Sequence, residues 1–148
     1  QQIANLIDKF SGQVSGESII EKNQVEIKEI FEQENIEEIL NKTYSLSQNG
    51  SEFSKNTEHE LKGKSPTSLK ITFKQIHMAT EMSLRDALIM EYRMVQRCQA
   101  SGDFYEGVRA MLVDKDRNPQ WKPSNLDKVD EIWVNHFFEP LHEKDLKI

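Results

Sequence analysis

The chain has 148 residues, the size of one domain, and a chain of this length can bury about two thirds of its unfolded surface. Its net charge of -6 and isoelectric point near 5.3 argue against nucleic-acid binding, because phosphate contacts need clustered lysine and arginine. No run of about 18 apolar residues occurs, so we expect no membrane-spanning helix.

The N-terminal part of the chain predicts short amphipathic helices. Its first residues show neither a basic start nor a cleavage site, so we expect no targeting segment in this chain. Apolar residues at helical spacing mark helices over residues 3–10, 23–31 and 35–46. The apolar face of the first of these helices consists of Ile3, Leu6, Ile7 and Phe10.

A polar connection follows these helices. Residues 45–64 contain Asn49-Gly50, a strong turn signal, although Phe53 and Leu61 indicate a helix under part of the stretch. We therefore divide the chain into two regions. The N-terminal helices with their polar connection occupy residues 1–64, and a second helical region occupies residues 65–148.

The second region opens with two clear helix starts. Ser65 before Pro66 is one, because a serine oxygen accepts from first-turn amides and proline lacks the amide that would stay unpaired. Ser83 with Asp86 three residues later is the other, and Gly102 is expected to end that helix in the left-handed conformation. The predicted buried stripes are Leu69, Phe73 and Ile76 in the first helix, and Leu84, Ala87, Leu88, Val95 and Cys98 in the second.

A third helix is predicted to begin at Asp103, which forms a capping pair with Glu106. Its predicted apolar face consists of Phe104, Val108, Met111 and Leu112. Beyond Pro123, a further short helix carries Val129, Ile132, Trp133, Phe137 and Phe138. Strand signals are scarce throughout, so the predicted class is all-α.

Catalytic and metal sites are not evident in the sequence. The single cysteine, Cys98, lies on an apolar helix face and is expected to be a small buried hydrophobe rather than a nucleophile. The four histidines are scattered, and no pair has the spacing of a zinc-protease helix. We therefore name no catalytic residue and no metal ligand. The histidines, expected at the surface, are His59, His77, His136 and His142.

Five segments of the second region form a specific pattern: Ser65-Pro66-Thr67-Ser68-Leu69-Lys70, Met90-Glu91-Tyr92-Arg93, Asp103-Phe104-Tyr105-Glu106-Gly107-Val108-Arg109-Ala110, Asp114-Lys115-Asp116 and Pro119-Gln120-Trp121-Lys122-Pro123. Together they resemble the C-terminal region of the 3-hydroxyisobutyryl-CoA hydrolase family, a branch of the crotonase (enoyl-CoA hydratase/isomerase) superfamily. The resemblance is specific over residues 65–123, weaker over residues 29–40, and slight before them.

This resemblance implies that the chain is the helical C-terminal part of a crotonase-like protein. The β-rich spiral domain, the oxyanion-hole amides and the catalytic carboxylates of the family would then lie in the missing N-terminal part. The implied parent hydrolyses a small branched hydroxyacyl-CoA in mitochondrial valine breakdown and needs no cofactor, since coenzyme A enters with the substrate. A hydratase or isomerase of the same superfamily, or a stand-alone helical interaction module, remain the alternatives.

One cluster in the matched region suggests a contact with the substrate. Lys115 and Lys122 flank Trp121 in a segment that two prolines hold extended, and cations beside an aromatic plane suit the adenine and phosphates of coenzyme A. Alternatively, Trp121 simply buries the end of a helix while the lysines face water. In either case the fragment alone is expected to be inactive.

The fragment is also expected to self-associate. Each main helix has apolar residues over a wider arc than one packing contact needs. Part of this apolar surface would therefore be left for the missing spiral domain to cover. The apolar residues off the main stripes are Ile71, Met78, Met90, Met94, Trp133 and Phe137.

Overall fold

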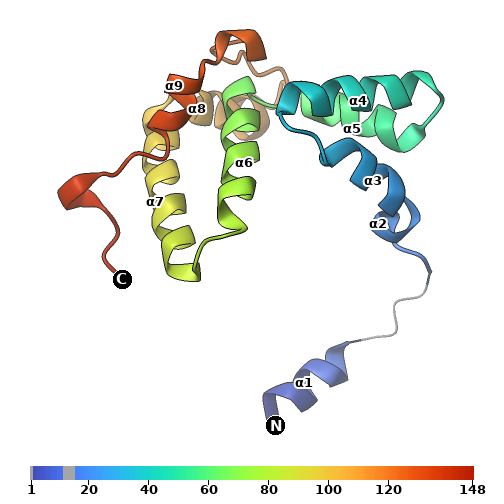
Figure 1. Ribbon diagram of the computed structural model, residues 1–148, viewed down its shortest axis with the longest axis horizontal. Helices are drawn as coiled ribbons and strands as arrows, with labels where there is room; N and C mark the ends of the chain where they lie inside the picture. Colours follow the sequence, from blue (N-terminus) through green and yellow to red (C-terminus); the bar gives the residue numbers. More distant parts are fainter. Residues whose placement is uncertain (1, 12–15) are drawn as a thin grey trace.

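The computed structural model describes residues 2–11 and 16–148, and its regular structure is helical (Figure 1). No β-strand occurs in this described part, which confirms the predicted all-α class. None of its helices is long and apolar enough to cross a membrane. In chain order the elements are α1 Gln2–Phe10, α2 Ile19–Lys22, α3 Gln24–Phe31, α4 Ile36–Gln48, α5 Glu52–Lys62, α6 Pro66–Ala79, α7 Leu84–Ala100, α8 Gly102–Val108, the π-helix η1 Arg109–Val113, the 3-10 helix η2 Leu126–Lys128, α9 Glu131–His136 and the 3-10 helix η3 His142–Lys144.

The helix α1 lies apart from the other helices in Figure 1. Its apolar residues Ile3, Leu6 and Ile7 are all exposed, so the face predicted for this helix packs on nothing in the described structure. The side chain of Phe10, predicted to share that face, lies outside the described residues.

The helices α4 and α5 form an antiparallel hairpin (Figure 1). Asn35 caps α4 by accepting from the Glu38 amide at 2.8 Å, and Gly50 at φ +93° makes the turn that its sequence predicts. The helix expected around Phe53 and Leu61 is confirmed as α5. A small core lies between this hairpin, α3 and α6. Its members are Ile30, Ile36 and Ile39, with Leu46, Phe53, Leu61, Leu69, Phe73 and Leu126 packed against them.

A second core joins α6, α7 and α9. Ile71, Met90, Met94, Val129, Val134 and Phe137 are its buried members. The helix α6 therefore serves both cores, because Ile71 faces α7 while Leu69 and Phe73 face the α4–α5 hairpin.

The stripes predicted for α6 and α7 are wrong in part. Ile76 is 60% exposed, and in α7 Leu84 and Leu88 are 77% and 42% exposed, whereas Met90 and Met94 are buried. Both helices are apolar on two sides, and helical periodicity shows that a face is apolar without showing which face is buried within this chain. The exposed residues of the predicted stripes are therefore available for contacts with another part of the protein or another molecule.

The end of α7 also differs from the expectation. The helix stops at Ala100 because Ser101 takes an extended backbone, with φ -85° and ψ 151°, and its hydroxyl donates to the carbonyl of Cys98 at 2.7 Å. Gly102 is not left-handed; it opens α8, which continues directly into the π-helix η1.

Candidate functional site

The side chain of Asp103 joins three segments that are distant in sequence. Its carboxylate accepts from the Ser65 hydroxyl at 2.6 Å and from the Lys122 amide at 2.9 Å. The same Ser65 oxygen accepts from the Ser68 amide at 3.1 Å and so caps α6 as predicted. The capping role predicted for Asp103 is wrong, because α8 has no side-chain cap and begins after Ser101. We call this arrangement of Ser65, Asp103 and Lys122 the clasp.

Trp121 reinforces the clasp. Its indole nitrogen donates to the carbonyl of Gly63 at 3.0 Å, in the connection between α5 and α6. Its ring lies over Gly107 in α8, where an added Cβ would come within 3.3 Å of the ring. The absence of a side chain at Gly107 therefore lets the indole bridge the connection and α8.

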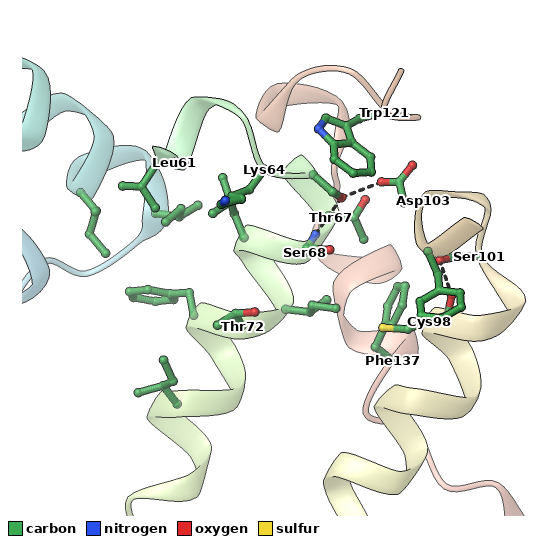
Figure 2. Close-up of a pocket in the computed structure, with 18 of the residues that line it drawn as sticks. Leu61, Lys64, Thr67, Ser68, Thr72, Cys98, Ser101, Asp103, Trp121 and Phe137 are labelled. Carbon is green, nitrogen blue, oxygen red and sulfur yellow. Dashed lines mark hydrogen bonds between the residues drawn. The ribbon is translucent and has the colours of Figure 1, made fainter. Parts of the chain in front are cut away.

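An open apolar cavity of about 580 Å³ lies beneath the clasp (Figure 2). Thr67 is 6% exposed, and its hydroxyl oxygen has no hydrogen-bond partner in the described structure. Half-buried Cys98 also faces the cavity, and burial raises the pKa of its thiol, which disfavours a nucleophilic thiolate. Other lining residues include Leu61, Thr72, Ile76, Phe104, Trp121 and Phe137. The cavity thus offers apolar contact rather than chemistry.

A network around Arg109 holds the turn that follows η1. The guanidinium donates to both oxygens of Glu106 at 2.7 and 2.9 Å, to Asp114 at 2.7 Å and to Asp116 at 2.6 Å. It also reaches the carbonyl of Asn118 at 3.3 Å. One cation therefore pairs with three carboxylates, and we call this arrangement the Arg109 network.

The ionisation of the network follows from these contacts. The Arg109 guanidinium, followed by the backbone amide of Gln120, lowers the pKa of Glu106 to about 2. Hydrogen bonds from Arg109 and from the Asn118 amide likewise stabilise the charged carboxylate of Asp116 and lower its pKa. In return, the carboxylates raise the pKa of Arg109, with Glu106 as the largest cause. Glu106, Asp116 and Arg109 are therefore charged at neutral pH.

The three residues predicted to touch coenzyme A do not line one pocket. Trp121 faces the apolar cavity, whereas exposed Lys122 borders a separate pocket of about 470 Å³ beside Glu106 and Arg109. Lys115 lines neither of these pockets and is exposed on the turn after η1. Within the described residues, neither lysine forms an ion pair.

Sequence reasoning missed the Arg109 network and misread the clasp. The i, i+3 spacing of Glu106 and Arg109 signals their pairing, but the pairing with Asp114 and Asp116 depends on the turn.

All four histidines are exposed, as expected, and no cluster of three metal-ligating side chains occurs among the described residues.

Comparisons with known proteins extend the resemblance to the whole chain. The profile of the enoyl-CoA hydratase/isomerase family matches residues 1–138, including the N-terminal residues in which the sequence showed little resemblance. The mitochondrial 3-hydroxyisobutyryl-CoA hydrolase of Gallus gallus is 40% identical over the full chain, which spans 39% of that protein. The chain therefore covers about two fifths of this relative.

Two solved structures share the fold. A carnitinyl-CoA dehydratase from Mycobacterium thermoresistibile superposes with a TM-score of 0.81 and 26% identity over 91% of this chain and 38% of its own. An enoyl-CoA hydratase from Rhodobacter sphaeroides 2.4.1 gives a TM-score of 0.82 and 26% identity over 99% of this chain and 44% of its own. The sequence profile and these helical superpositions lead to one conclusion: the chain belongs to the enoyl-CoA hydratase/isomerase family.

Proposed function

We propose that this chain is the helical C-terminal part of a mitochondrial enzyme that hydrolyses 3-hydroxyisobutyryl-CoA or a similar small hydroxyacyl-CoA thioester in valine breakdown. The observation that carries the proposal is the 40% identity to 3-hydroxyisobutyryl-CoA hydrolase along the entire chain, against 26% to the dehydratase and hydratase structures. The remaining three fifths of the protein would supply the carboxylate that activates water and the amides that bind the thioester oxyanion.

The partner of this chain is then the spiral domain of the same polypeptide. The exposed apolar side chains support this, because contiguous apolar surface is rare on a soluble monomer and marks a surface that another body covers. They include Ile76, Leu84, Leu88, Val95, Phe104, Met111, Leu112, Val113 and Ile132. The unpaired hydroxyl of Thr67 in the apolar cavity adds a polar group that a docked segment would satisfy.

The contribution of this chain to the active site would be a contact with the nucleotide of coenzyme A. Lys115 and Lys122 are exposed cations that form no salt bridge in the described structure, although the charge of Lys122 contributes to the lowered pKa of Glu106, and both side chains are accessible to phosphate. Trp121, whose indole donates to the Gly63 carbonyl and packs over Gly107, lines the separate apolar cavity and would contact a different part of the ligand from the two lysines.

The test compares hydrolysis with hydration in the intact protein that carries this chain. Thiol release from 3-hydroxyisobutyryl-CoA and water addition to a 2-enoyl-CoA are followed separately. Thiol release that greatly exceeds hydration is the expected result. Hydration without thiol release would instead support the hydratase alternative, and neither activity in a folded intact protein would leave the helical interaction module as the better account.

A further inference from the structure

We propose that Arg109 is a positioning residue for coenzyme A. It pairs with the two carboxylates that neighbour Lys115, so that they do not neutralise this lysine, and it fixes the turn that presents Lys115 to phosphate. The inference deepens the proposed function and rests on its contact between Lys115 and coenzyme A. Arg109 itself is occupied by protein groups and is not expected to touch the ligand.

The arrangement of charge supports this role. Lys115 stands between Asp114 and Asp116 in the sequence, so these carboxylates are the nearest candidates to neutralise it. Both of them bind the guanidinium instead, at 2.7 and 2.6 Å, and Lys115 forms no ion pair in the described structure. Without Arg109, the Asp114-Lys115-Asp116 segment would carry a net negative charge and repel phosphate. With both aspartates paired to the guanidinium, the charge of Lys115 is left for a ligand.

The backbone supports the same role. Lys115 and Arg117 both have left-handed backbones, with φ of 57° and 54°, a conformation that is uncommon for residues with side chains. They follow the π-helix η1, and π-helical segments occur often at functional sites. Such strain persists only where surrounding contacts hold it. Here the Asp114 amide donates to the Arg109 carbonyl at 2.8 Å, and the Arg117 amide donates to the Ala110 carbonyl at 3.0 Å.

The side chain of Arg109 adds further contacts to the same turn. It reaches Asp114, Asp116 and the carbonyl of Asn118, so three successive parts of the turn are tied to one rigid group. A guanidinium suits this task because its donors form a planar fork that can bind several acceptors at once. A lysine at this position would supply a point charge without the fork.

The experiment measures kcat and KM of the intact hydrolase with two substrates, the coenzyme A thioester and the pantetheine thioester, which lacks the nucleotide phosphates. Arg109→Gln is expected to raise KM for the coenzyme A thioester about tenfold, the effect of losing one charge-assisted contact, with kcat and the pantetheine thioester little changed. Arg93→Gln is the matched control, because it removes another half-buried two-pronged arginine–carboxylate pair, with Asp145, far from the turn in sequence.

A second variant separates positioning from general stability. Removing the freed carboxylates with Asp114→Asn and Asp116→Asn in the Arg109→Gln background should restore the part of the affinity lost to their charge, whereas the part lost with the fixed turn should remain lost. An equal loss with both thioesters, or no restoration in the triple variant, would overturn the inference. Lys115→Ala tests the underlying contact: if it raises KM and Arg109→Gln does not, only the role of Arg109 fails, whereas an intact protein without thiol release refutes the proposed function itself.

Discussion

Replacing Asp103 tests whether the clasp stabilises the fold. In Asp103→Ala both the Ser65 hydroxyl and the Lys122 amide lose their acceptor. Hydrogen bonds to a charged group contribute about 1.5 to 3 kcal/mol each when well buried, and Asp103 is half-buried, so we expect a loss of about 2 kcal/mol in total. Asp103→Asn keeps one acceptor oxygen and should lose about half as much.

The measurement is urea denaturation of the chain at low concentration, with a double-mutant cycle between Asp103→Ala and Ser65→Ala. The clasp predicts a coupling energy of about 1 kcal/mol, because the two side chains share one hydrogen bond. Asp86→Ala is the control: Asp86 pairs with Ser83 within the exposed first turn of α7, and its loss should cost at most about 0.5 kcal/mol. An unchanged midpoint for Asp103→Ala, or independent effects in the cycle, would refute the reasoning.

Three further predictions follow from charge, packing and exposure. The pKa of Glu106 is about 2 in the folded chain against 4.5 ordinarily, so its stabilising contribution is complete above about pH 5 and is lost as the pH falls toward 2; denaturant melts should show a shallower acid dependence in Glu106→Gln. Phe137→Ala should destabilise the chain by about 3 to 5 kcal/mol, because Phe137 is 1% exposed, whereas Ile132→Ala, at 82% exposed, should change the midpoint little. Light scattering over a concentration series should detect self-association of the chain that weakens when Leu88 and Val95 are changed to serine; a strictly monomeric chain that binds no hydrophobic dye would contradict this.

Features fixed by neighbouring residues could be predicted from the sequence. Ser65 and Ser83 cap α6 and α7 as expected, because a cap depends on a side chain and an amide three residues away. The turn at Gly50 and the all-α class follow from equally local signals. Local chemistry therefore determines where these helices begin.

Features fixed by distant contacts could not be predicted. Asp103 has the spacing of a cap, yet its partners Ser65 and Lys122 lie 38 and 19 residues away. The buried face of α7 was similarly ambiguous, since this helix has two apolar sides and the chain buries only the side with Met90 and Met94. Under the proposed function the exposed side of α7 would contact the spiral domain, and no pattern within this chain specifies such a contact.

The most direct test of the account is a split of the intact protein at the start of this chain. The two parts are purified separately, mixed in increasing ratio, and assayed for thiol release from 3-hydroxyisobutyryl-CoA. We predict that each part alone is inactive and that mixing restores hydrolysis, saturating at equimolar ratio, because in the proposed function the helical part would complete and cover the catalytic domain. Full hydrolysis by the other part alone, unchanged on addition of this chain, would contradict the account.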